Sequence, residues 1–173
     1  MFGDYLVNGI IAATFWASTF LNAEASLING LDVKSQLAEV SFSVGEVSFQ
    51  GESIGNEVTI FAASPHSFGP LQPTFSLSVT DQGGTWFGYG FLNTLEISEK
   101  SFAKFRFMPG VYSAGNDVEL GGWLMFKSEI ELGFEINEFW AISLGYDHRS
   151  SGDIWEYNPG METVQLKVTR QKF

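Results

Sequence analysis

The feature of this sequence that most constrains its fold is a two-residue alternation of apolar and polar side chains, repeated many times after residue 37. Between residues 124 and 136, for example, Phe126, Ile130 and Leu132 alternate with Lys127 and Glu131. Successive side chains of a strand point to opposite faces, so each such segment is typical of a strand with one apolar face. Turn signals separate the segments. We predict eight strands and no helix among them, at residues 38–49, 56–63, 72–80, 85–98, 101–113, 121–136, 138–150 and 161–173.

Eight alternating strands fit two architectures: a soluble lipocalin-like barrel with its apolar face inside, and a membrane barrel with that face towards lipid. The chain has 17 Phe, and aromatic residues make up 16% of it, which is more aromatic volume than an eight-stranded lumen can hold. The predicted strands also reach the roughly 9–11 residues that a tilted strand needs to cross a bilayer. We therefore predict an all-β fold: an eight-stranded antiparallel transmembrane β-barrel of outer-membrane type, in a single domain over residues 26–173. The terminal Phe173 resembles the assembly signal of such barrels.

The N-terminal segment has a different pattern. Residues 5–21 are largely apolar, and Ala23-Glu24-Ala25 is the A-x-A pattern of a signal peptidase site. We predict a signal peptide over residues 1–25, although no Lys or Arg precedes Lys34. A retained membrane helix and a segment that plugs the barrel are the alternatives.

Charge and composition exclude several functions. The net charge is −11 with only nine basic residues, which argues against nucleic-acid binding. The chain has no Cys and two His, so we expect no metal site and no cofactor. Gly51-Glu52-Ser53-Ile54-Gly55 matches the G-x-S-x-G pattern of a nucleophile elbow, but no helix is predicted after it, so we interpret it as a hairpin turn. We expect His66 to be an exposed loop residue.

The seventh predicted strand ends in two residues that could carry chemistry. His148 and Ser150 share the parity of the apolar residues before them, and Glu162 shares the parity of the apolar residues of the last strand. The three side chains are therefore expected on the outer face at the rim of one hairpin. Serine is a poor nucleophile until a base takes its proton, a histidine can do so, and a carboxylate can orient that histidine. The alternative is that they are solvated rim residues without a catalytic role.

This part of the chain resembles a known family. HRSSG at residues 148–152 and NPGME at residues 158–162, followed by a closing strand, look like the end of the lipid A 3-O-deacylases, the PagL-type outer-membrane esterases. The resemblance implies a carboxylic ester hydrolase that removes an ester-linked 3-hydroxyacyl chain from lipid A. It implies a catalytic triad of His148, Ser150 and Glu162. It also implies that Asn158 binds the oxyanion, and Gly152 is the expected second donor to that oxyanion.

Substrate contacts and partners follow from the same resemblance. Tyr146 and Trp155 are expected to pack on the acyl chain, and Arg149 to meet a lipid A phosphate or to act as a rim anchor. The expected location is the bacterial outer membrane. The expected partners are lipid A in lipopolysaccharide, outer-membrane lipids, the barrel assembly machinery and, as an open question, a second copy of the chain. The rival functions are a non-catalytic adhesin or structural barrel, and a soluble lipocalin-like carrier.

Overall fold

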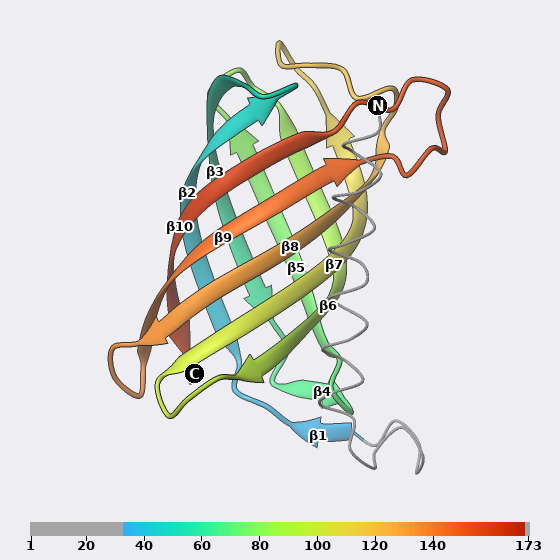
Figure 1. Ribbon diagram of the computed structural model, residues 1–173. Coiled ribbons are helices and arrows are strands. Elements are labelled where there is room, and N and C mark those ends of the chain that lie inside the picture. The colour runs from blue at the N-terminus through green and yellow to red at the C-terminus, as the bar shows by residue number, and fades with distance from the viewer. Residues whose placement is uncertain (1–32, 172–173) are drawn as a thin grey trace.

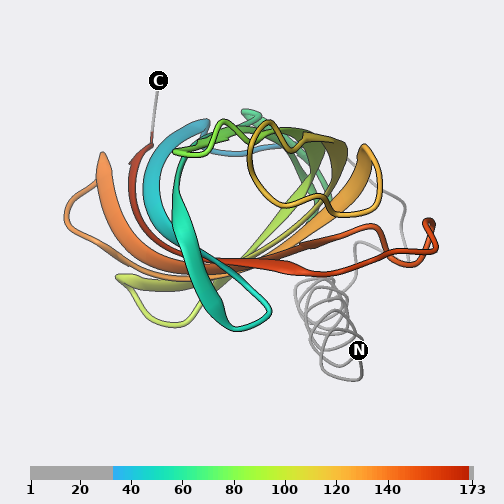
Figure 2. The ribbon, with the colours of Figure 1, turned by 90° about the horizontal axis from the view of Figure 1, so that it is seen from above.

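The eight long strands close into an antiparallel barrel in the computed structural model, which describes residues 33–171. Figures 1 and 2 show the barrel from the side and from above. The predicted signal peptide lies outside the described residues. Around the barrel the order is β10-β2-β3-β5-β6-β7-β8-β9, so the last long strand closes on the first. The strands are β2 (Glu39–Phe49), β3 (Glu52–Ala63), β5 (Gln72–Thr80), β6 (Thr85–Glu96), β7 (Ser101–Ser113), β8 (Leu124–Glu135), β9 (Trp140–Ser150) and β10 (Met161–Gln171).

The predicted strands agree with this arrangement, and the differences lie at their ends. β3 begins at Glu52, four residues before the predicted start, because the turn from β2 needs only Gln50 and Gly51. The G-x-S-x-G segment is thus part of a hairpin, as interpreted. A separate two-stranded sheet of β1 (Val33–Ser35) and β4 (His66–Phe68) was not expected. His66 is exposed as expected, but it begins β4 instead of lying in a loop.

The apolar faces of the strands point outwards. Phe75, Leu77 and Val79 of β5 are 47%, 51% and 48% exposed, whereas the alternate Ser76 and Ser78 are buried inside the barrel. This orientation confirms the transmembrane barrel and contradicts the soluble carrier, whose apolar face would line the lumen. Within the described residues, no helix is long and apolar enough to cross a membrane.

Charged side chains fill the lumen and pair with one another. Arg106 Nη1 lies 2.5 Å from Glu129 Oε1 and also bonds Glu131, while Lys167 Nζ donates to the same two carboxylates. Burial of a charge is costly unless it is paired, and this network supplies the pairs. The buried charged residues of the lumen are Glu39, Glu57, Lys104, Arg106, Lys127, Glu129, Glu131, Asp147, Arg149 and Lys167.

An apolar cluster fills the interior near one end of the barrel. Its buried members include Trp86, Tyr112, Leu120, Met125 and Met161, from three strand starts, one strand end and a loop. The loops at residues 114–123 and 151–160 are at this end, whereas the turns at 97–100 and 136–139 are at the other (Figure 1). Apolar side chains from the strands and one loop therefore fill the interior near the loop end.

Candidate active site

His148 lies on the outer row of β9, directly between two polar residues of the neighbouring strands. Its partner across β10 is Glu162, and its partner across β8 is Ser128. His148 Nδ1 is 3.1 Å from Glu162 Oε1, within hydrogen-bonding distance. The two residues, fourteen apart in the chain, meet because the hairpin of β9 and β10 places them opposite each other. In a catalytic triad the carboxylate bonds Nδ1 of the histidine, and Nε2 accepts the proton of the nucleophile. Glu162 contacts His148 at Nδ1, as such a carboxylate would.

The other ring nitrogen of His148 remains available. His148 Nε2 is buried and has no hydrogen-bond partner among the described residues. Ser150 is two residues further along the same outer row, where its Cβ lies about 6–7 Å from that of His148 by the rise of a strand. A ring nitrogen of this kind can accept the proton of a nearby hydroxyl once the side chains tighten around a substrate.

The candidate site is covered in this structure. His148 has no exposed surface and Ser150 is 2% exposed, although both lie on the face that points out of the barrel. The cover includes the loop at residues 151–160, whose last residue packs on the imidazole: a Cβ at Gly160 would lie 2.2 Å from His148 Cε1. In Figure 2 this loop extends sideways from the barrel wall.

Asn158 and Gly152, the expected oxyanion residues, both belong to this loop. Asn158 Oδ1 accepts hydrogen bonds from the backbone N–H of Ser151 at 2.8 Å and from Ser151 Oγ at 2.7 Å. Asn158 Nδ2 donates to Asp153 Oδ1 at 2.8 Å. Gly152 is exposed and has a φ of 60°. Asn158 is therefore bonded to the residue next to Ser150, while Gly152 forms the turn that follows.

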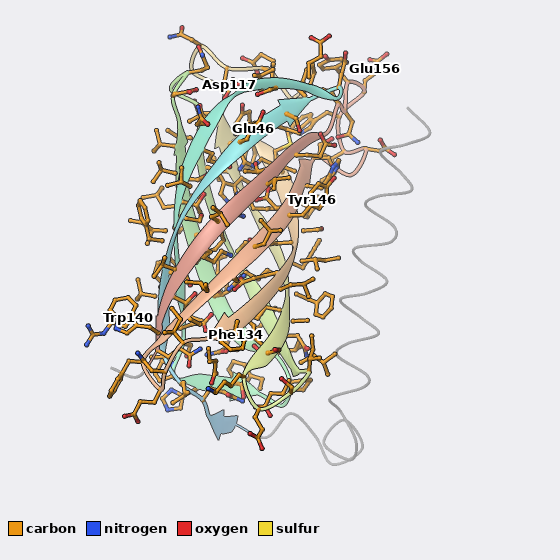
Figure 3. All side chains as sticks on the ribbon, turned by 60° about the vertical axis from the view of Figure 1, so that its left-hand side comes forward. Glu46, Asp117, Phe134, Trp140, Tyr146 and Glu156 are labelled. Carbon is orange, nitrogen blue, oxygen red and sulfur yellow. The ribbon has the colours of Figure 1, made fainter. Side chains whose placement is uncertain are left out.

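The expected acyl-chain contacts lie in different surroundings. Tyr146 is half-buried on the outer row of β9 (Figure 3). Its cross-strand partners are Ile130 of β8 and Val164 of β10. Trp155 instead packs against the internal apolar cluster, and its Nε1 lies 3.4 Å from the carbonyl oxygen of Leu124. Only Tyr146 of the two thus continues the lipid-facing surface below the site.

The expectation for Arg149 is wrong. Its side chain is buried inside the lumen, where Nη2 donates to Glu57 Oε1 at 2.6 Å and the guanidinium lies over the ring of Trp86. The physical reason is parity: Arg149 lies between His148 and Ser150, so it points to the opposite face of β9. It therefore contacts neither a lipid phosphate nor the membrane surface.

Ser128 also adjoins His148, and the sequence pattern alone did not predict this. This residue is on the outer row of β8, is 5% exposed and is the cross-strand partner of His148. A polar residue in an otherwise apolar row was a visible signal, but the pairing register that puts it beside His148 is not contained in the local pattern. The imidazole thus has a second hydroxyl nearby, in addition to that of Ser150.

The arrangement is suited to nucleophilic catalysis by a hydroxyl, because a carboxylate, an imidazole and serines adjoin on one surface. Over residues 33–171, no three or more His, Asp or Glu side chains gather in a way that could hold a metal ion.

Comparison with known proteins identifies the family. The family model of lipid A 3-O-deacylase (PagL) matches residues 75–170, which include β9, the loop and most of β10. The chain belongs to this family. Membership places it among the lipid A deacylases of the bacterial outer membrane, as the resemblance implied. A search of curated proteins finds no match.

Solved structures show the same fold. The crystal structure of the outer membrane enzyme PagL is similar with a TM-score of 0.60 at 16% identity, over 76% of this chain and 97% of that chain. A de novo designed transmembrane β-barrel has a TM-score of 0.57 at 11% identity, over 80% and 97% of the two chains. Neisserial surface protein A has a TM-score of 0.53 at 13% identity, over 82% and 99%. The likeness to a designed barrel and to a surface protein speaks for the fold, not for the chemistry.

Proposed function

We propose that this protein is a serine esterase that removes an ester-linked 3-hydroxyacyl chain from lipid A, with Ser150, His148 and Glu162 as its catalytic triad. The observation that carries the proposal is the pair of His148 Nδ1 and Glu162 Oε1 at 3.1 Å, which leaves Nε2 without a partner two residues from Ser150. A histidine held in this way accepts a proton at Nε2 and becomes an imidazolium that the carboxylate stabilises.

The reaction would proceed through an acyl-enzyme. Ser150 Oγ forms a bond to the ester carbonyl carbon while its proton moves to His148 Nε2. The bond between that carbon and the sugar oxygen then breaks, and His148 returns the proton to the leaving alkoxide. Water repeats the sequence on the acyl-serine and releases the 3-hydroxy fatty acid. Asn158 Nδ2, with Gly152 as the second expected donor, would stabilise the oxyanion, and such donors typically contribute about 10²–10³ in rate.

The position of the site suits a lipid substrate in the outer leaflet. Outer-membrane barrels have short periplasmic turns and longer extracellular loops, so the end with the loops at 114–123 and 151–160 faces outwards from the cell. Below the site, the outer row of β9 continues through Tyr146, Leu144 and Ile142, on which an acyl chain can pack without leaving the membrane.

The nucleophile is the point to test, because Ser150 and Ser128 both adjoin His148. Purified protein in detergent is incubated with lipid A, and the released 3-hydroxy fatty acid and the shortened lipid are measured by mass spectrometry. We expect Ser150→Ala to abolish release, with the rate reduced by at least about 10³-fold. The matched control Ser128→Ala keeps the rate within a few-fold of wild type.

Two results would contradict the proposal. One is a Ser150→Ala protein that releases the acyl chain at the wild-type rate. The other is a wild-type protein that leaves lipid A intact although its shift in gel mobility on heating shows a folded barrel. The second result would favour the rival function of a non-catalytic adhesin or structural barrel.

A further inference from the structure

The side-chain amide of Asn158 is fixed by three hydrogen bonds that also define its orientation. Its Oδ1 accepts from the backbone N–H of Ser151, a group that can only donate, and from the hydroxyl of Ser151. Its Nδ2 donates to the carboxylate of Asp153, a group that accepts when ionised. The oxygen and the nitrogen of the amide could not be exchanged without losing both unambiguous bonds. Asp153 and Ser151 therefore hold the amide from its two ends.

Within residues 33–171, the three hydrogen bonds of this amide use only one of its two N–H groups. A carboxamide nitrogen carries two hydrogens, and the bond to Asp153 uses one of them. Asn158 Oδ1 is meanwhile held against Ser151, the residue that directly follows Ser150. We infer that Asp153 is a positioning residue, which orients Asn158 so that its second N–H donates to the oxyanion formed when Ser150 attacks the ester. This inference rests on the proposed function.

The backbone of the loop brings Asp153 into this position at some cost. Gly152 and Asp153 have φ values of 60° and 64°, in the left-handed region. Glycine adopts that region freely, and Asp does so more readily than most residues because its short side chain bonds nearby groups. Two successive left-handed residues reverse the chain, and the carboxylate at 153 then reaches the amide at 158.

The charge of Asp153 opposes the benefit of its position. A carboxylate near a developing oxyanion repels it, and because Asp153 is exposed, solvent reduces this repulsion without removing it. A neutral acceptor at residue 153 would keep the hydrogen bond to Asn158 Nδ2 without the repulsion. Positioning therefore predicts that Asp153→Ala loses activity and Asp153→Asn keeps it, whereas a role that needs the negative charge of the carboxylate predicts a loss in both.

The experiment measures kcat and KM for lipid A release with the full-length protein in detergent. We expect Asp153→Ala to lower kcat about tenfold, a fraction of the 10²–10³ that a whole oxyanion donor contributes, with KM within about twofold. Asp153→Asn should equal or exceed the wild-type kcat. In an Asn158→Ala background, Asp153→Ala should cost less than about twofold, because the amide it orients is gone. The control is Glu156→Ala, an exposed carboxylate of the same loop.

Three results would overturn the inference: an unchanged kcat in Asp153→Ala, an equal loss in Asp153→Ala and Asp153→Asn, or the same loss with and without Asn158. Shifted gel mobility on heating verifies that each variant is folded. Ser150→Ala, measured in the same series, separates this inference from the proposed function. If Ser150→Ala is inactive and Asp153→Ala is fully active, the triad stands and the positioning role falls. If Ser150→Ala is active, both fall.

Discussion

At the scale of single residues, the site depends on close contacts that involve glycine. Gly160 packs on the imidazole of His148, where a Cβ would lie 2.2 Å from Cε1 and 2.9 Å from Nε2. Real Cβ atoms do not approach other atoms so closely, so any side chain at residue 160 has to displace the ring or the loop. The glycine lets the loop cover His148 while the ring keeps its bond to Glu162.

Gly160→Ala tests this contact. We expect a folded barrel whose deacylation rate falls by about ten- to a hundredfold, because a displacement of about 1 Å at a catalytic group costs that much. Gly145→Ala is the control. Gly145 lies on the lumen face of β9, the strand that carries His148, and its added methyl group meets the flexible side chain of Gln165 at 3.1 Å. Rates are measured by release of the 3-hydroxy fatty acid. A Gly160→Ala protein as active as wild type would show that the contact does not position His148.

At the scale of elements, the alternation of apolar and polar residues predicts the eight long strands and the face on which their side chains lie. β5 and β7 have the predicted bounds, and the parity of β9 and β10 correctly places His148, Ser150 and Glu162 on the outer face. Local pattern does not give the pairing register, so Ser128 was missed. The local pattern also does not predict contacts between loops. Gly121 packs so closely on Tyr157 of the other loop that a Cβ at Gly121 would lie 1.7 Å from the Tyr157 carbonyl oxygen.

The error over Arg149 has a different origin, because parity alone would have placed this residue inside the barrel. The expectation followed residue type and proximity to the site, whereas the partner Glu57 is 92 residues away in the chain. We predict that Arg149→Ala lowers the free energy of unfolding by about 3–5 kcal/mol, since it leaves Glu57 buried without its closest cation. The measurement is urea unfolding in detergent micelles, with the exposed Lys100→Ala as control. Unchanged stability together with a raised KM for lipid A would instead favour a substrate contact.

At the scale of the whole molecule, the barrel combines a lipid-facing exterior with a lumen whose charges balance. The five buried cations of the lumen are matched by five buried carboxylates, so the net charge of −11 resides on the rest of the chain. Near the loop end, the apolar cluster around Trp86, Tyr112 and Met125 occupies the interior. The outer wall can therefore contact lipid, while the paired charges and the apolar cluster inside the barrel stabilise the fold.

This interior predicts that the protein does not conduct ions. Paired charges occupy the lumen and the apolar cluster occupies the interior near the loop end, so we expect no continuous aqueous path through the barrel of residues 39–171. In planar lipid bilayers, we expect purified protein at neutral pH to give no stepwise conductance above background. A larger outer-membrane porin, whose lumen is an aqueous channel, serves as the positive control. Reproducible open-channel steps with this protein would contradict the sealed interior.

The claim on which the account rests is that Ser150 carries the acyl chain during the reaction. Its most direct test is to quench the reaction of the wild-type protein with lipid A in acid, digest with trypsin and determine the mass of the peptide that follows Arg149, residues 150–167. The account predicts a mass increase by one 3-hydroxyacyl group, which fragmentation assigns to Ser150 and not to Ser151. An acyl group on the peptide that contains Ser128, or product formation without any acylated serine, would contradict it.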